Sequence, residues 1–361
     1  MGVWRRVFPA AVAWMGLTGG SCATAPDDVP VTGGRTYRMG FSGFPPKPDL
    51  GAAIASLTMW TTRADVAVFH VEVPWRLLLT GGDLTAHLNA EYTGLAAFYR
   101  SKGLPIYVTF DVTDGLAREK EARELRELGR SITEPVVQRR FRDFVGAWVT
   151  AIRPEFVGLG AETNLVRLAA PRAVYDALRT LTAATAPDVR AILPTATLYT
   201  TVQAEVAWGR LPLTNRYVGI TEDLRDFAWA QAIGVSSYPY LGGFATPDDI
   251  PLDYLSRLRG AGVMPLFVSE GGWSSAAVTG VTSSPALQAA YVRRMSQVLQ
   301  AASATAWLQL NFTDLDTAAF PVPAGYEEIL SLFVRIGLVD SELRPKPSLA
   351  AWDSVFATPK R

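Results

Sequence analysis

The sequence is poor in the side chains that most often bind metals or form covalent cross-links. Its 361 residues include one cysteine and two histidines. One cysteine cannot build an intramolecular disulfide framework, and two histidines are too few for a metal site made mainly of histidine ligands. Charge of one sign is not in excess either, because 34 Lys and Arg balance 34 Asp and Glu. Neutralising phosphates requires a basic surplus, so the composition disfavours a nucleic-acid partner.

Several short motifs of other enzyme classes are also missing. No HExxH or CxxC spacing occurs, no serine lies in a GxSxG context, and no GxGxxG fingerprint follows the first apolar strand. These absences argue against a zinc hydrolase, a serine hydrolase and a dinucleotide-binding enzyme. No lysine stands at a predicted strand end, which disfavours Schiff-base chemistry. We therefore expect neither a metal nor an organic cofactor.

The N-terminus differs in composition from the rest of the chain. Residues 1–22 combine a basic start, an apolar stretch too short to span a bilayer comfortably, and small residues that end in Cys22. This order resembles a bacterial lipoprotein signal, in which the cysteine is lipidated, although Gly19 stands where a leucine-like residue is usual. The alternative is an ordinary secretory signal with an incidental cysteine. Residues 23–34 have no apolar period and are predicted to be a linker, so the folded domain is expected over 35–361.

From Tyr37 onward, short apolar segments typical of buried strands alternate with segments of helical period. The predicted strands cover residues 37–44, 65–73, 105–112, 155–163, 190–198, 232–239, 265–273 and 304–312. Eight such repeats over about 320 residues predict an α/β fold, a single-domain (β/α)8 TIM barrel. A doubly wound open sheet is the alternative, but polar residues at nearly every predicted strand end favour the barrel.

Four of the intervening segments carry clear helical patterns. Residues 84–103 end at Gly103, a plausible C-cap, and residues 136–152 place five large apolar side chains on one face. Residues 283–302 begin with Ser-Ser-Pro, a typical helix start. Residues 326–338 are predicted to close the set of helices.

Polar side chains are predicted at the carboxyl ends of the strands, where barrel enzymes carry their active sites. They are Ser42, Glu72, Asp111, Glu162, Thr197, Tyr238, Glu270 and Asn311. Glu162 ends the fourth strand and Glu270 the seventh, so they are expected on opposite sides of the barrel mouth. Hydrolysis of a glycosidic bond needs two carboxyl groups that flank the bond. The two glycines after Glu270 allow the backbone to turn without Cβ crowding.

Three stretches resemble the clan A retaining glycoside hydrolases, in particular the endo-β-1,4-galactanase branch. They are GLGAETN at the fourth strand, IGVSSYPYL at the sixth and VSEGGW at the seventh. The closing segment GLVDSELRPKPSLAAW also resembles the end of many barrel glycosidases. The resemblance extends over the whole barrel in the order of its elements, but in residues only over these short stretches.

The resemblance implies roles for individual residues. Glu162 would be the general acid and base, and Glu270 the nucleophile. Tyr238 would donate a hydrogen bond to Glu270 and help to keep it ionised. Trp273 and Trp307 would offer apolar platforms for sugar rings.

One departure from the family pattern concerns the residue before the acid. The family nearly always has Asn there, which holds the sugar 2-hydroxyl, whereas this chain has Ala161. That hydrogen bond contributes several kcal/mol to transition-state binding in such enzymes. The change implies a substrate without this contact, a substitute donor such as Asn164, or a barrel that binds glycan without cleaving it.

The remaining candidates are polar residues at the strand ends. Glu72 is expected either to bind sugar hydroxyls or to pair with Arg76, and Asp111 is expected to contact substrate. Asn311 is a candidate ligand on the eighth strand. His70 alternates with apolar residues of the second strand, so it points into the barrel mouth or is a core histidine.

Together these features predict an exported glycoside hydrolase that cleaves a β-linked polysaccharide or oligosaccharide with retention. It is expected to be a monomer, in the periplasm or at the cell surface, tethered to the membrane through a lipid on Cys22. The alternative function is a catalytically inactive barrel that binds an envelope or extracellular polysaccharide.

Overall fold

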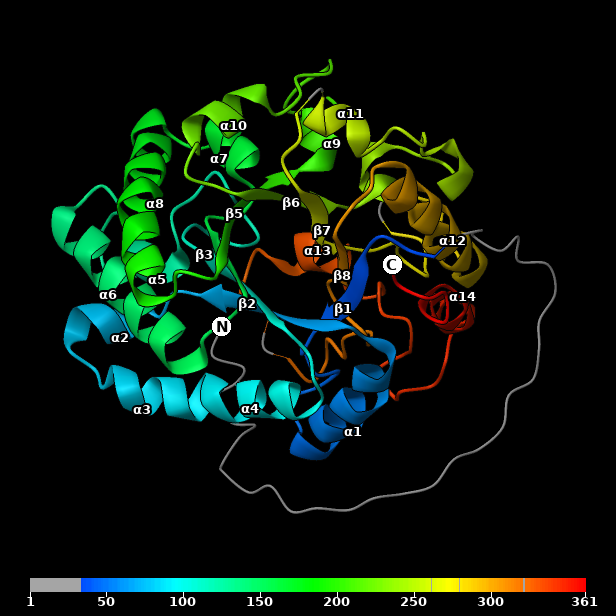
Figure 1. The fold of residues 1–361 in the computed structure, drawn as a ribbon, viewed down its shortest axis with the longest axis horizontal. Helices are drawn as coiled ribbons and strands as arrows, with labels where there is room; N and C mark the ends of the chain where they lie inside the picture. Colours follow the sequence, from blue (N-terminus) through cyan, green and yellow to red (C-terminus); the bar gives the residue numbers. More distant parts are fainter. Residues whose placement is uncertain (1–33, 261, 279, 321) are drawn as a thin grey trace.

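The structure, a computed structural model, describes residues 34–260, 262–278, 280–320 and 322–361. Eight parallel strands form a closed barrel in which each strand pairs with the next and β8 pairs with β1 (Figure 1). The strands are β1 (Arg38–Ser42), β2 (Val66–Glu72), β3 (Ile106–Asp111), β4 (Phe156–Leu159), β5 (Thr197–Gln203), β6 (Ala232–Ser237), β7 (Leu266–Gly271) and β8 (Ala306–Gln309). The predicted TIM barrel is confirmed.

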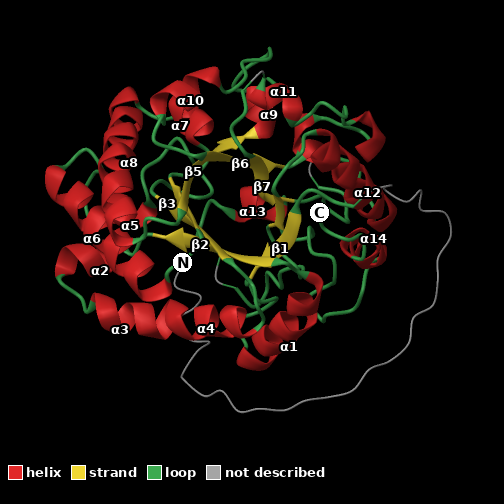
Figure 2. Cartoon of the chain, in the orientation of Figure 1, coloured by secondary structure: helices red, strands yellow, loops and turns green. Residues whose placement is uncertain are grey.

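Most of the helices surround the barrel on the outside, whereas α13 (Glu327–Ser331) lies at the centre of the ring of strands (Figure 2). The helices are α1 (Leu50–Trp60), η2 (Thr61–Arg63), α2 (Trp75–Thr80), α3 (Leu84–Leu88), η3 (Asn89–Thr93), α4 (Gly94–Ser101), α5 (Arg123–Glu127), α6 (Pro135–Ile152), α7 (Thr163–Ala169), α8 (Arg172–Ile192), α9 (Ala204–Ala207), α10 (Thr221–Asp226), η4 (Pro239–Gly242), η5 (Pro247–Asp249), α11 (Ser256–Arg259), α12 (Pro285–Ala301), α13 and α14 (Pro347–Phe356). None of those in the described ranges is long and apolar enough to cross a membrane. The predicted signal at 1–22, with Cys22, and the linker up to residue 33 lie outside the described residues.

Alternation along the strands separates two buried layers. One set of side chains fills the inside of the barrel: Val66, Val68, Tyr107, Tyr199, Ala232, Phe267, Ala306 and Leu308. The intervening residues point outward and pack against the helices. The five apolar residues expected on one face of α6 are all buried there: Val137, Phe141, Phe144, Val145 and Trp148.

Two predicted helix ends are confirmed. Ser284 caps α12, because its side chain accepts a hydrogen bond from the amide of Leu287. Gly103 follows the end of α4 with a φ of 72°, the left-handed conformation that glycine adopts readily after a helix. Residues 84–103 are nevertheless not one α-helix, because the π-helical turn η3 separates α3 from α4.

The prediction for the fifth strand is wrong, because most of the residues at 190–198 do not belong to a strand. Residues 190–192 are the end of α8, and the strand runs instead over Thr197–Gln203. The apolar run at 190–198 combines the last helical turn, in which Val189 is buried, with the beginning of the strand. Thr197 therefore begins β5 and does not lie at the barrel mouth.

The prediction for the last helix is also wrong. Of residues 326–338, only Glu327–Ser331 are helical, and α14 is the helix that packs outside the barrel after β8. The apolar residues of this segment pack over the mouth of the barrel. The ring of Phe333 lies 4.8 Å from that of Tyr238, and the carbonyl of Ile336 accepts from Gln309 Nε2. Figures 1 and 2 show α13 at the centre of the ring of strands.

Candidate active site

Glu162 lies just beyond β4, with 11% of its side chain exposed. Its φ of 46° is a left-handed conformation that non-glycine residues adopt rarely and often at functional sites. The amide of Glu162 donates to Thr201 Oγ1 over 2.8 Å, and Ser236 Oγ donates to Glu162 Oε1 over 2.5 Å. Residues of β5 and β6 therefore fix both its backbone and its carboxyl group.

Arg118 pairs with Glu162, although no sequence pattern pointed to it. Its Nε donates to Glu162 Oε2 over 2.9 Å, and its Nη1 lies 2.5 Å from both carboxylate oxygens of Asp111. Burial opposes the charge of Arg118, but the two carboxylates together raise its pKa above the ordinary value. Arg118 is therefore a permanent cation inside the site. Because it comes from an irregular connection after β3, no periodicity could have revealed it.

Asp111 and Glu72 lie side by side at the ends of β3 and β2, where they are partners in the strand register. Burial raises the pKa of Asp111, and the charge of Arg118 offsets this only in part. Glu72 is exposed at the mouth. Arg76, its alternative partner, lies with Nη2 2.8 Å from Glu127 Oε2.

Glu270 reaches the mouth because β7 is irregular. Val235 of β6 lies opposite Val268, but the next residue, Ser236, lies opposite Glu270, which leaves Ser269 as an extra residue. In a regular strand Glu270 would point outward as Val268 does. The bulge turns its side chain towards the site, a use of bulges that is common near active sites.

The hydrogen bond expected between Tyr238 and Glu270 is confirmed: Tyr238 Oη donates to Glu270 Oε1 over 2.9 Å. Burial first, and then the negative charge of Glu162, raise the pKa of Glu270 to about 7, while Arg118 and Tyr238 oppose the rise. The His70 Nδ1 atom lies 3.7 Å from Glu270 Oε2. Burial and the charge of Arg118 lower the pKa of His70 to about 4, so its imidazole is neutral near pH 7 and this contact is not an ion pair.

A further buried carboxyl group binds the backbone of Tyr238, and no sequence pattern pointed to it. Glu205, fully buried just after β5, accepts hydrogen bonds at Oε1 from the amide of Tyr238 over 3.0 Å and from Tyr254 Oη over 2.5 Å. Ser237 Oγ donates to the same oxygen, and Gln203 Nε2 donates to Oε2. Burial raises the pKa of Glu205. The misplaced fifth strand hid this residue, because it follows the true strand end.

Asn164 cannot be the substitute donor for a sugar hydroxyl. It is fully buried, its Nδ2 donates to the carbonyl of Gln203 over 2.9 Å, and its Oδ1 accepts from the amide of Gln203 over 2.8 Å. The amide group is thus used to join the start of α7 to the end of β5. Ala161 is also buried and offers no polar side chain.

The two tryptophans predicted as sugar platforms are fully buried, so that prediction is wrong for both. Trp307 points outward from β8, because Ala306 and Leu308 occupy the barrel interior, and it packs on Trp352 with ring centroids 4.8 Å apart. Trp273 packs between aromatic rings beyond β7, and its Nε1 donates to Ser283 Oγ over 2.9 Å. Asn311, two residues beyond β8, is 3% exposed, and its contact with substrate stays a prediction.

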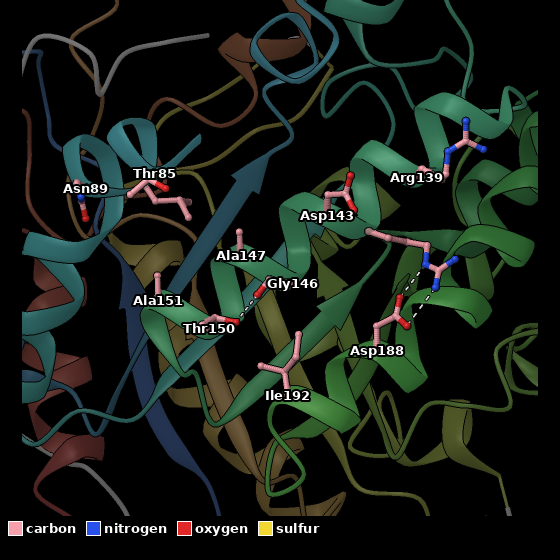
Figure 3. Close-up of a pocket in the computed structure, with 12 residues that line it drawn as sticks. Thr85, Asn89, Arg139, Asp143, Gly146, Ala147, Thr150, Ala151, Asp188 and Ile192 are labelled. Atoms are coloured by element: carbon pink, nitrogen blue, oxygen red, sulfur yellow. Dashed lines mark hydrogen bonds and ion pairs between the residues drawn. The ribbon is translucent and has the colours of Figure 1, made fainter. Parts of the chain in front are cut away.

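A separate hollow of about 700 Å³ lies on the outside of the barrel between α3, α6 and α8 (Figure 3). Polar and apolar side chains line it together, the Arg142–Asp188 ion pair among them, and none of the carboxyl groups at the mouth reaches it. In the part of the chain that the structure describes, no group of three or more His, Cys, Asp or Glu residues could hold a metal ion. The chemistry that the geometry supports is therefore at the barrel mouth.

The sequence matches no protein-family model and no curated protein, but its fold is similar to many solved structures. An exo-β-1,4-mannosidase from Opitutaceae bacterium strain TAV5 has a TM-score of 0.64 at 16% identity, over 90% of this chain and 60% of that one. The GH53 catalytic domain of Ignisphaera aggregans has a TM-score of 0.56 at 16% identity, over 84% and 88%. A GH5_18 protein from Streptomyces cattleya, in complex with GlcNAc, has a TM-score of 0.63 at 16% identity, over 91% and 82%. At such identities the similarity shows the fold alone, a (β/α)8 barrel.

Proposed function

We propose that this protein is a glycoside hydrolase that cleaves a β-linked polysaccharide or oligosaccharide with retention of configuration. The observation that carries the proposal is that Glu162, just beyond β4, and Glu270, at the end of β7, both lie at the barrel mouth, where Arg118 and Ser236 bind the first and Tyr238 binds the second. Two carboxyl groups that flank the scissile bond are what this reaction requires. The similarity of the fold to glycoside hydrolase structures supports the same conclusion.

In the proposed reaction Glu270 is the nucleophile and Glu162 is the general acid and base. The Glu270 carboxylate bonds to the anomeric carbon while the bond to the leaving oxygen breaks, and Glu162 gives its proton to that oxygen. Water then attacks the anomeric carbon, Glu162 takes a proton from the water, and Glu270 leaves as a carboxylate. Two inversions at this carbon retain the configuration.

Before substrate binds, the proton is not where the reaction needs it: Glu270 can hold it, whereas the reaction needs it on Glu162. Arg118 Nε and Ser236 Oγ both donate to the carboxyl group of Glu162, whereas the pKa of about 7 lets Glu270 hold a proton in neutral solution. Glu162 can act as an acid only after Arg118 has separated from it and the proton of Glu270 has passed to it, which leaves Glu270 as the carboxylate nucleophile. We propose that a substrate hydroxyl takes the place of Glu162 on the guanidinium group while Asp111 stays bound to it.

Recognition of the sugar is assigned to the polar groups that remain accessible at the mouth. Glu72 and Asp111 can accept hydrogen bonds from sugar hydroxyls, because carboxylate oxygens are acceptors. Ala161 cannot bind a 2-hydroxyl, so the substrate is expected to gain little from that position. Asn311 would contribute only if a side-chain movement exposed it further.

The second candidate function is a barrel that binds an envelope or extracellular glycan without cleaving it. The Arg118–Glu162 ion pair favours this alternative, because Arg118 occupies the carboxyl group that would have to donate the proton. Ala161 favours it as well. The ion pair and Ala161 weaken the stabilisation of the transition state more than the binding of the glycan itself. A protein that only binds glycan could therefore contain both.

We propose in addition that the protein is exported, that a lipid on Cys22 anchors it to the membrane, and that it is a monomer. Mass spectrometry of the membrane-bound protein would find a diacylglyceryl-type mass increase at Cys22, and Cys22→Ala would release the protein from membranes. A wild-type protein that stays soluble and without added lipid mass would contradict the anchor but leave the proposed hydrolase intact.

The hydrolase is tested with chain 34–361 and its variants Glu270→Gln and Glu162→Gln. Each is incubated with β-1,4-galactan, β-1,4-mannan and bacterial exopolysaccharides while reducing ends are measured. We expect release by the wild type and a loss of at least about a hundredfold in either variant, because general acid–base catalysis alone contributes that much. Tight binding of one glycan without release by the wild type would support the binding protein instead.

A further inference from the structure

The segment from Tyr326 to Phe333, called the strap here, crosses the barrel mouth. It belongs to the long connection between β8 and α14 and contains the short helix α13. In the two ribbon views it lies at the centre of the ring of strands (Figures 1 and 2). None of the residues of α13 is buried, so the strap is not part of the hydrophobic core.

One end of the strap is bound to the connection after β3. Tyr326 Oη donates a hydrogen bond to Asp114 Oδ2, and Arg126 Nη2 donates to Tyr326 Oη over 3.0 Å. Arg126 Nη2 also lies 2.7 Å from Asp114 Oδ2. Asp114 is 7% exposed and its Oδ1 accepts from the amide of Leu116, so it is a fixed anchor.

The other end is bound to residues that follow β6. Tyr240 Oη donates to the carbonyl of Leu332 over 2.7 Å. The ring of Phe333 packs edge-on against the ring of Tyr238, with centroids 4.8 Å apart. Tyr238 is the residue that donates to Glu270, so the strap passes directly beside the proposed nucleophile.

β3 and β6 are three strands apart in a ring of eight, so a segment anchored at both spans the mouth. A glycan bound through internal sugars would have to continue past the site in both directions, and the strap occupies one of them. We propose that the strap makes the enzyme exo-acting, so that only the end of a glycan chain reaches Glu162 and Glu270. This inference rests on the proposed hydrolase function and adds its mode of attack.

The test compares the wild type with Tyr326→Phe, which removes the hydroxyl that joins the strap to Asp114 and Arg126. The matched control is Tyr175→Phe, which removes a tyrosine hydrogen bond to Asp226, also beside an arginine, on the outside of the barrel. For whichever of β-1,4-galactan, β-1,4-mannan and the exopolysaccharides is hydrolysed, viscosity loss is measured against reducing ends released. Thermal unfolding of each variant checks that it is folded.

We expect the wild type and Tyr175→Phe to release reducing ends with little loss of viscosity. Tyr326→Phe should lose more viscosity per end released, by up to about tenfold, because the variant loses both hydrogen bonds of the Tyr326 hydroxyl and a tenfold shift of the strap towards an open state corresponds to about 1.4 kcal/mol. A wild type that lowers viscosity early, as internal cleavage does, would overturn the inference but leave the hydrolase proposal standing. Absence of hydrolysis of every glycan by the wild type would overturn the hydrolase, and the exo mode with it.

Discussion

Glu162 and Glu270 are the same residue type near the ends of two equivalent strands, yet their surroundings make them different acids. Arg118 and Ser236 bind the carboxyl of Glu162, whereas Glu270 has only the hydroxyl of Tyr238 and a neutral imidazole beside it. At the residue scale, the site is therefore an asymmetric pair: a guanidinium and a hydroxyl bind one carboxyl group, and a pKa of about 7 lets the other hold a proton in neutral solution. Opposed surroundings for two carboxyl groups are how one site supplies both an acid and a base.

The first prediction concerns the pH dependence of hydrolysis. The reaction needs one proton on the pair, on Glu162, and the pair loses this proton above about pH 7, so kcat/KM should fall as the pH increases through about 7. Tyr238→Phe removes a hydrogen bond that lowers the pKa of Glu270, so the fall should move to higher pH by about one unit. The pH profile of the variant is compared with that of Tyr99→Phe, which alters a fully buried tyrosine between the barrel and the helices. An unchanged profile in Tyr238→Phe would show that this bond does not control Glu270.

The second prediction concerns stability and needs no substrate. The pKa of Glu270 is higher in the folded protein than in the unfolded chain. Its contribution to stability is therefore greatest at acidic pH and is lost as the pH rises from about 4.5 to about 7. Glu270→Gln should be more stable than the wild type at pH 8 by about 1–3 kcal/mol, and equally stable near pH 4.

Urea unfolding at both pH values measures this difference. A variant that is less stable than the wild type at pH 8 would show that Glu270 is held by stronger favourable contacts than the structure contains. The same experiment on Asp143→Asn serves as a control, since Asp143 is exposed on α6, outside the barrel.

Sequence patterns identified Glu162, Glu270, Asp111 and Tyr238 because each lies at or just beyond a strand end. They could not identify Arg118, whose position depends on the path of an irregular connection. Trp307 was misread, although its alternation with Ala306 and Leu308 indicates an outward side chain. Within a strand, the alternation of residues shows which side chains point inward. The path of a loop follows from no short periodic pattern in the sequence.

At the scale of the elements, the bulge in β7 and the glycines after Glu270 act together. A Cβ on Gly271 would lie 2.6 Å from the carbonyl oxygen of Ser237, and one on Gly272 would lie 3.0 Å from Gln309 Nε2. The glycines are therefore required by the close approach of β6 and β8 to the end of β7. The sequence shows the two glycines after Glu270, but it does not show that β6 and β8 approach them closely.

The third prediction follows from this approach. Gly271→Ala should destabilise the protein by about 1–3 kcal/mol, because the strand end must shift away from Ser237. Gly94→Ala is the matched control: Gly94 begins α4 with nothing within 4 Å of the added Cβ, so the change should stabilise the helix by up to about 1 kcal/mol. Urea unfolding of both variants gives the comparison, and equal effects of the two changes would contradict this reading of β7.

Two elements show where sequence patterns fail at this scale. The run at 190–198 is apolar in both its helical and its strand part, so composition alone could not place the boundary within it. The segment at 326–338 has helical spacing, but its apolar residues pack over the barrel mouth on Tyr238. A hydrophobic period shows that one face is buried and does not show against which part of the molecule.

At the scale of the whole molecule, the barrel brings residues that are distant in the sequence to one end of the fold. Connections after β3 and β8 then add Arg118 and the strap, which distinguish this mouth from a bare ring of strand ends. Eight repeats were compatible with a barrel or an open sheet, and the polar residues at nearly every predicted strand end favoured the barrel. The mode of attack on a glycan belongs to this scale, because it depends on loops that meet across the mouth.

The most direct test of the account is covalent trapping of the nucleophile. Chain 34–361 is incubated with cyclophellitol-type epoxides of gluco, galacto and manno configuration, and its mass and peptides are analysed by mass spectrometry. The account predicts that one configuration adds its mass once per chain, on the peptide that contains Glu270, and that Glu270→Gln is not labelled. Labelling on Glu162 instead, or hydrolysis of glycans by a protein that no configuration labels, would contradict the assignment of Glu270 as the nucleophile.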